Sequence, residues 1–169
     1  MDKKIIIAAV VITLLVLGGA VVLLGKSSST STKASLEKIA GAKVEAKETS
    51  FDFKDVPYSG GNVEHAFPIK NSGDKDLKIA NLVTSCMCTK VYMKTSKEKS
   101  PEFGMKGHEA ASNWTGTLTP GEEGQVVAVF DPTAHGPQGV GPISRLVSFE
   151  TNDPDHPYME FGFSGTVIK

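Results

Sequence analysis

The sequence predicts an all-β fold: an antiparallel, immunoglobulin-like β-sandwich of about seven strands, preceded by one N-terminal transmembrane helix. Three observations predict it. Residues 5–24 form an almost unbroken apolar run. Beyond residue 43, apolar and polar residues alternate with the period of two that is typical of strands, and clusters of Gly, Pro, Asn and Asp separate these segments. No stretch of this later part shows the periodicity of a three-turn amphipathic helix.

The apolar run has the length of a membrane span. Its only polar residue is Thr13, and about 20 residues at 1.5 Å each cross the roughly 30 Å hydrocarbon core. A cleaved signal peptide is the alternative, but its apolar region is usually about 7–15 residues long. The length therefore favours an uncleaved signal anchor. Lys3 and Lys4 favour a cytoplasmic tail at residues 1–4, whereas Lys26 and Lys33 on the other side oppose it. A short tail without a bulky domain is easily left inside, so we expect the C-terminal domain outside the cell membrane.

A polar segment follows the predicted anchor. Residues 26–33 read KSSSTSTK, which is Ser-rich and without periodicity. Such a composition is typical of a flexible tether. We therefore expect a tether at residues 25–42 and the sandwich domain at residues 43–169.

The charge of the predicted domain argues against nucleic-acid binding. Residues 43–169 contain 13 basic and 17 acidic side chains, and Arg145 is the only arginine among them. A nucleic-acid binder needs a basic surface to displace counterions from phosphates. No DNA or RNA partner is expected.

Five segments of the domain have the composition of strands. In the first, Val63, His65 and Phe67 alternate with polar or small residues, so His65 is expected at the core or its rim. The predicted strands are residues 63–70, 77–84, 125–131, 143–151 and 158–168. Residues 92–117 do not fit the strand pattern and are too long for a hairpin loop, so we expect a loop excursion that could carry function.

Several motifs occur in an order that resembles a known family. They are Ile69-Lys70-Asn71-Ser72-Gly73, Ser85-Cys86-Met87-Cys88-Thr89, Leu118-Thr119-Pro120-Gly121-Glu122, Val129-Phe130-Asp131-Pro132 and Thr151-Asn152-Asp153-Pro154. This order resembles the bacterial family called domain of unknown function 1573. The resemblance implies an immunoglobulin-like sandwich of the Hydin and major-sperm-protein kind, commonly preceded by a signal or membrane segment. The family usually has Gly between the two cysteines, where this chain has Met87.

The two cysteines are the best candidates for chemistry. Cys86 and Cys88 are two residues apart, and such residues share one face of a strand. Paired thiolates can chelate a soft metal ion such as Cu(I) or Zn. Met93, Met105 and His108 in the excursion are the candidate additional ligands.

Two other interpretations of the cysteine pair remain open. Cys86 and Cys88 could form a disulfide, whose small strained ring would be easily reduced and would suit redox exchange. They could also be small buried side chains with a structural role. His135, between Ala134 and Gly136, is expected to be a turn or surface residue.

The sequence favours a binding module over an enzyme. It contains no Gly-x-Ser-x-Gly elbow, phosphate-binding Gly-rich loop or His-Glu-x-x-His motif. We expect a single-pass membrane protein whose extracytoplasmic sandwich has a binding or structural role and contacts a protein or envelope partner. The alternative function is a copper or redox site at Cys86-Met87-Cys88.

Overall fold

The structure is a computed structural model that describes Lys3, residues 12–13 and residues 33–169. The predicted cytoplasmic tail and transmembrane anchor therefore lie almost entirely outside the described residues. Within the described part of the chain, no helix has the length and apolar character required to cross a membrane. The compact unit that carries the fold runs from Thr32 to Lys169.

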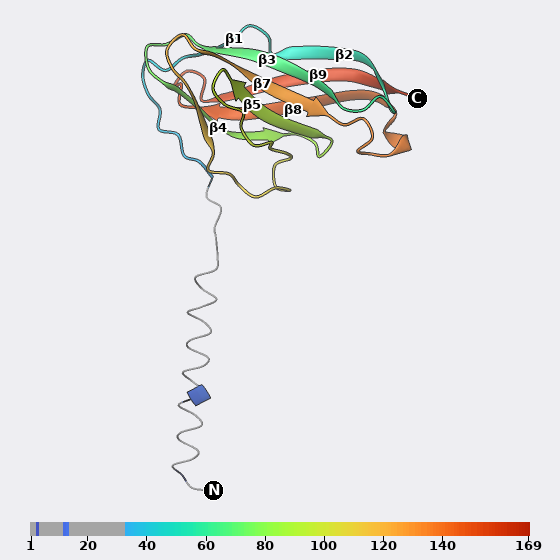
Figure 1. Cartoon of the computed structure of the whole chain (residues 1–169), viewed down its shortest axis with the longest axis horizontal. Helices are drawn as coiled ribbons and strands as arrows, with labels where there is room; N and C mark the ends of the chain where they lie inside the picture. The colour runs from blue at the N-terminus through green and yellow to red at the C-terminus, as the bar shows by residue number, and fades with distance from the viewer. Residues whose placement is uncertain (1–2, 4–11, 14–32) are drawn as a thin grey trace. The chain divides into compact units, whose positions relative to one another are not determined.

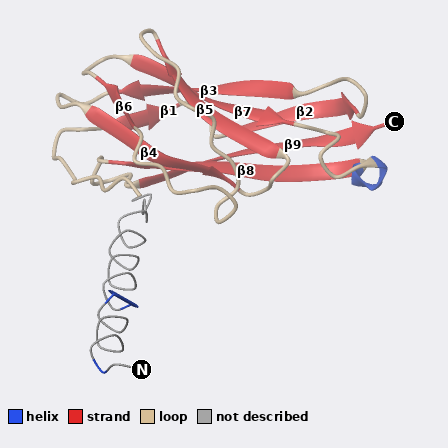
Figure 2. Cartoon of the chain, turned by 60° about the horizontal axis from the view of Figure 1, so that its bottom comes forward, coloured by secondary structure: helices blue, strands red, loops and turns tan. Residues whose placement is uncertain are grey.

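Two β-sheets form this unit (Figures 1 and 2). The four-stranded sheet has the order β1-β3-β7-β5, with strands at Val44–Ala46, Val63–Asn71, Glu123–Phe130 and Thr89–Thr95. The five-stranded sheet has the order β2-β9-β8-β4-β6, with strands at Ser50–Pro57, Tyr158–Ile168, Gly141–Thr151, Leu77–Thr84 and Thr115–Leu118. A single turn of 3₁₀ helix, Pro137–Gly139, precedes β8. The predicted all-β sandwich is confirmed.

Two details of the predicted architecture were wrong. The described residues contain nine strands instead of about seven. The sheets are also not wholly antiparallel, because β2 pairs with β9 in parallel, from Ser50 opposite Gly162 to Pro57 opposite Ile168. A bulge at residues 52–55, where Lys54 has a φ of 60°, interrupts this pairing.

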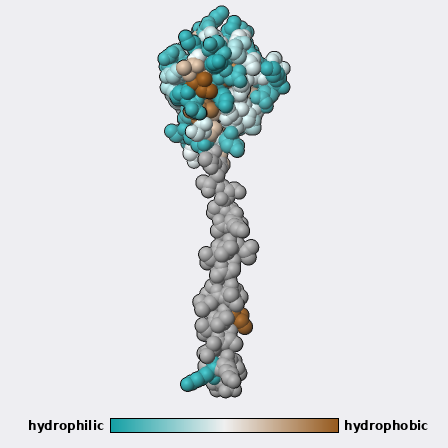
Figure 3. All heavy atoms as spheres, turned by 90° about the vertical axis from the view of Figure 1, so that its left-hand side faces the viewer, coloured by the Kyte–Doolittle hydropathy of each residue, from teal (hydrophilic) through white to brown (hydrophobic). Residues whose placement is uncertain are grey.

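Alternating apolar residues from both sheets fill the core. Strand β9 coincides with the predicted residues 158–168, and Phe161 and Phe163 on one of its faces are buried. The largest fully buried side chains of the other strands include Phe67, Phe149, Ile69, Leu77, Ile79, Leu82 and Met93. Burying such side chains from two facing sheets is the main stabilising contribution in a sandwich. The face seen in Figure 3 is mostly hydrophilic, with one small apolar patch.

Part of the predicted tether lies against the domain. The Ile39 backbone N–H donates to the Asn152 carbonyl at 2.9 Å, and the Lys38 ammonium donates to the Thr151 carbonyl at 2.6 Å. Ala42 is fully buried. Residues 33–42 thus differ from a free linker, because backbone hydrogen bonds and a buried methyl group fix them to the sandwich.

The predicted excursion also has structure. After β5, the chain turns back so that Val91 and Phe103 exchange two backbone hydrogen bonds of 2.8 Å. It then reaches β6, which pairs with the first half of β4. Residues 98–103 therefore cover the outer edge of β5, which would otherwise present unpaired backbone groups.

Candidate functional site

The cysteine pair lies on a turn that crosses from one sheet to the other. Residues 85–88 connect β4 in the five-stranded sheet with β5 in the four-stranded sheet. The expectation that Cys86 and Cys88 share a strand face was therefore wrong, because the strand ends at Thr84. Their side chains nevertheless converge, with 2.7 Å between the two Sγ atoms, and both cysteines are free.

Buried threonines at the two strand ends fix the shape of this turn. The Thr84 hydroxyl lies within hydrogen-bond distance of the carbonyls of Cys86, at 2.9 Å, and of Thr89, at 3.1 Å. The Thr89 N–H donates to the Cys86 carbonyl at 3.1 Å. Both Thr84 and Thr89 are buried. These bonds close a compact turn whose position follows from the ends of β4 and β5.

The neighbouring strands hold the turn from outside. Ser85 and Leu146 exchange two hydrogen bonds of 2.9 Å, one of them through the Ser85 hydroxyl. On the other side, the Asp131 N–H donates to the Cys88 carbonyl at 2.9 Å. The turn is therefore anchored to β8 in one sheet and to the end of β7 in the other.

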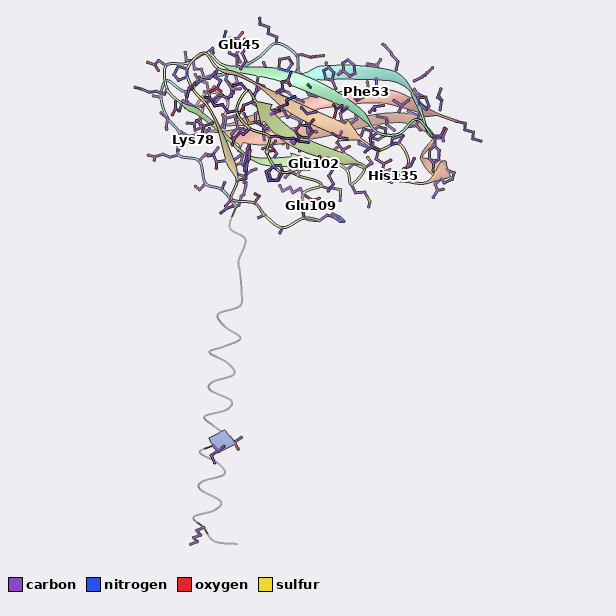
Figure 4. All side chains as sticks on the ribbon, viewed as in Figure 1. Glu45, Phe53, Lys78, Glu102, Glu109 and His135 are labelled. Atoms are coloured by element: carbon purple, nitrogen blue, oxygen red, sulfur yellow. The ribbon has the colours of Figure 1, made fainter. Side chains whose placement is uncertain are left out.

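His135 reaches the site because β5 and β7 are neighbours. Thr89 pairs with Phe130, so the segment after β7 emerges beside the cysteine turn. The Asp131 carboxylate accepts hydrogen bonds from the N–H and hydroxyl of Thr133, at 2.8 and 2.6 Å, which curl this segment back. His135 Nε2 then lies 3.2 Å from Cys86 Sγ. Figure 4 places His135 at the end of the domain opposite Lys78.

Arg145 of β8 contributes the positive charge of the site. Its Nε atom donates to Cys88 Sγ at 3.1 Å, and its Nη1 atom donates to the Ser144 carbonyl at 2.8 Å. Arg145 is half-buried. A cation held in this way stabilises negative charge on either thiol.

The two thiols have different surroundings. Cys86 is partly exposed, whereas the exposed fraction of Cys88 is 2%. Burial opposes ionisation of Cys86, but hydrogen bonds from the Cys88 thiol and N–H, the His135 contact and the charge of Arg145 lower its pKa to about 7. Burial and the hydrogen bond to Cys86 raise the pKa of Cys88, although Arg145 partly offsets them. The accessible sulfur is thus the more easily ionised one.

The other predicted ligands lie elsewhere. Met93 is buried in the hydrophobic core. Met105 lines a groove of about 440 Å³ together with Phe103 and Tyr158. His108 is exposed, and its N–H donates to the Met105 carbonyl at 3.1 Å. Among the His, Cys, Asp and Glu side chains of the described residues, the group that the structure brings together is Cys86, Cys88 and His135.

His65 and the Asn152–Asp153 turn take part in packing and hydrogen bonds that stabilise the fold. His65 stacks on Phe51 with ring centroids 3.6 Å apart and contacts the Glu48 carboxylate at 3.1 Å. Asp153 is fully buried, and one of its oxygens accepts the Val44 N–H at 2.9 Å. The Asn152 side-chain oxygen accepts the Lys78 N–H at 2.7 Å. These side chains join distant segments of the sandwich.

Comparison with known proteins confirms the family resemblance and the fold. Residues 44–105 match the model of the family described as protein of unknown function DUF1573. No curated protein matches this chain. The matched residues include the Asn71-Ser72-Gly73 turn and both cysteines, but not His135 or Arg145.

Two of the solved structures that match this chain come from a bacterium and from humans. A protein of unknown function from Porphyromonas gingivalis W83 has a TM-score of 0.55 and 16% identity over 82% of this chain. This chain spans 51% of the length of that protein. The ASH/PapD-like domain 7 of human CEP192 has a TM-score of 0.46 and 23% identity, over 84% of this chain and 96% of that one. The first of these likenesses, at 16% identity, concerns the fold alone.

Proposed function

We propose that this DUF1573-type sandwich is a module for thiol–disulfide exchange, which uses Cys86 as the attacking thiol and Cys88 as the resolving thiol. The observation that carries the proposal is the 2.7 Å separation of two free sulfur atoms with unequal exposure. The two sulfur atoms are thus close enough for a disulfide to form between them. The partner is a protein that carries a disulfide or a dithiol.

The surroundings of Cys86 support its role as the attacking group. The thiolate is the nucleophile in such reactions, and an attacking thiol performs best when its pKa is close to the ambient pH. The pKa of Cys86 is lowered to about 7, and its sulfur is partly exposed. The exposed Met87 beside it leaves the apex of the turn open to a partner.

The exchange proceeds in two steps in which atoms and electrons balance. The Cys86 thiolate attacks one sulfur of the partner disulfide, so a mixed disulfide forms and a partner thiolate leaves. Cys88 then loses its proton and attacks Cys86 Sγ, which breaks the mixed disulfide and releases the second partner thiol. The domain loses two electrons and two protons, and the partner disulfide becomes two thiols. We propose a stoichiometric, non-enzymatic role, in which each exchange converts the dithiol of the domain into the Cys86–Cys88 disulfide.

We also propose that residues 5–24 anchor the domain to the cell membrane and that it faces the extracytoplasmic side. The apolar length of this segment and the lysines at its N-terminal side support the proposal. A membrane-impermeant thiol reagent added to intact cells should label Cys86. Labelling that requires broken cells would contradict the proposed orientation.

Trapping the mixed disulfide tests the exchange function. The full chain in detergent, with Cys88→Ser, is incubated with oxidised glutathione and analysed by intact-mass spectrometry. We expect glutathione to accumulate on Cys86, whereas the matched Cys86→Ser chain should react much more slowly at Cys88. Equal trapping rates for the two single variants would contradict the assigned roles. The unsubstituted chain should lose two hydrogen atoms instead, because Cys88 resolves the intermediate.

A further inference from the structure

A third donor atom joins the two sulfurs at this end of the sandwich. Cys86 Sγ, Cys88 Sγ and His135 Nε2 all lie within 4.8 Å of one another. They come from two segments far apart in sequence, and the bond from the Asp131 N–H to the Cys88 carbonyl ties these segments together. The three donors are therefore brought together by the fold and not by local sequence alone.

These three donors are ligands for a soft metal ion. Thiolates favour Cu(I) and Zn, and imidazole suits both metals. Structural zinc sites are almost always tetrahedral, with four protein ligands. In the part of the chain that the structure describes, this group of His, Cys, Asp and Glu ligands has three members. The number of donors thus does not match a closed zinc site.

The charge of Arg145 distinguishes further between the two ions. Two thiolates and one Cu(I) carry a net charge of −1, and the guanidinium that donates to Cys88 Sγ makes the cluster neutral. With Zn²⁺ the same cluster would carry a charge of +1. A partly buried site disfavours an uncompensated charge, so the guanidinium favours the monovalent ion.

We propose that the reduced domain binds one Cu(I) ion through Cys86 Sγ, Cys88 Sγ and His135 Nε2, with Arg145 balancing the charge of the thiolates. This ligand set replaces Met93, Met105 and His108 of the sequence-based hypothesis with His135. The site opens toward solvent on the side of Cys86, which is partly exposed, and His135, which is exposed. Cys88 and Arg145 form its more buried side.

The copper site and the exchange reaction use the same sulfurs in different ways. An ion requires the two sulfurs to lie apart on either side of it, whereas a disulfide requires them to approach. The two states therefore exclude each other. His135 separates the two proposals, since it is a ligand of the ion but forms no bond in the disulfide.

The test is a competition for Cu(I) under anaerobic, reducing conditions. The full chain in detergent competes with bicinchoninate, a chromogenic Cu(I) chelator. We expect one equivalent to be bound and His135→Asn to weaken the affinity about tenfold or more, since even loss of an outer-shell contact typically costs 10–100-fold. The matched control is His108→Asn, which replaces an exposed histidine on another loop and should leave the affinity unchanged.

Three results would overturn the copper site. In the first, the reduced chain binds no copper. In the second, His135→Asn and the unsubstituted chain have equal affinity for Cu(I). In the third, His108→Asn binds Cu(I) more weakly than the unsubstituted chain does. Far-UV circular dichroism of each variant checks that the sandwich is intact. His135→Asn should still form the Cys86–Cys88 disulfide with oxidised glutathione. Loss of copper affinity with disulfide formation retained thus supports the copper site, while failure of the disulfide alone contradicts the exchange function.

Discussion

The Nε atom of Arg145 lies 3.1 Å from the sulfur of Cys88, although 57 residues separate them. Arg145 is on β8 and Cys88 is on the turn that leaves β4, which is the neighbour of β8 in the same sheet. This relationship gives the cysteine pair its positive surroundings. The reactivity of the thiols therefore also depends on how β4 and β8 pair within their sheet.

The first prediction concerns the pH dependence of Cys86 alkylation. The pKa of Cys86 is about 7 instead of the ordinary 9.0, and only the thiolate reacts. The rate of iodoacetamide labelling at Cys86 should therefore reach half its maximum near pH 7 and increase little above pH 8. Peptide mass spectrometry resolves the two cysteines, and Cys88 should be labelled more slowly at pH 7.

Arg145→Gln should shift this profile. Loss of the cation removes one of the interactions that favour the Cys86 thiolate, so its pKa should rise. Labelling at pH 7 should become slower, and the midpoint should move to higher pH. Arg145→Lys keeps the charge and should give an intermediate midpoint. An unchanged midpoint in Arg145→Gln would show that the guanidinium does not influence the thiols.

A second kind of prediction concerns the buried carboxylate of Asp153. Its oxygens accept the N–H groups of Val44, at 2.9 Å, and Asp155, at 2.8 Å. In Asp153→Ala these donors lose their acceptor, and an unsatisfied buried donor costs about 1–3 kcal/mol. We expect the free energy of unfolding to fall by about 1–3 kcal/mol in urea denaturation, chiefly because the buried Val44 N–H loses its acceptor. The control Asp155→Ala, at an exposed position, should change it little.

Glu122 should stabilise the fold in a pH-dependent way. Hydrogen bonds from the N–H and hydroxyl of Thr119, with a contribution from Lys97, lower its pKa from 4.5 to about 2. A carboxyl group with a lowered pKa stabilises the folded state above the unfolded pKa, and this contribution is lost as the pH falls through the folded one. Glu122→Gln should thus lower Tm at pH 7 and have a much smaller effect near pH 2, where the folded-state carboxyl is about half-protonated.

The neighbouring residue is the control for this prediction. Glu123→Gln removes a carboxylate whose nearest cation, Lys70, lies 3.7 Å away on the surface. Exposed ion pairs contribute little, so Tm should change by less than in Glu122→Gln at pH 7. A decrease in Tm for Glu122→Gln that is equal at pH 7 and pH 2 would contradict the assigned role of its charge.

The sequence was sufficient to predict those parts of the structure that local patterns determine. The alternation around Phe161 and Phe163 predicts β9 residue by residue. The turn at Pro120-Gly121 is equally local, because Gly121 has a φ of 79° and the Glu122 N–H donates to the Thr119 carbonyl at 2.9 Å. The closeness of Cys86 and Cys88 along the chain is evident in the sequence, but the convergence of their side chains follows from the turn after β4. Short edge strands such as β1, with three residues, leave too weak a pattern to predict.

The rest of the site depends on strand pairing that no local pattern specifies. His135 approaches Cys86 because β5 lies beside β7, and Arg145 approaches Cys88 because β4 lies beside β8. In the sequence, His135 has the appearance of an ordinary loop residue. The Asp131-Pro132 turn after a strand is the one signal near it, and it becomes informative only when the neighbour of that strand is known.

A redox titration of the full chain tests the central claim most directly. Free thiols are counted after equilibration, without metal, in glutathione buffers of increasing oxidised fraction. We predict that both thiols disappear together in one two-electron transition and that the product is the Cys86–Cys88 disulfide. Two thiols that remain free across the series, or that acquire glutathione independently of each other, would contradict an exchange-active pair at this end of the sandwich.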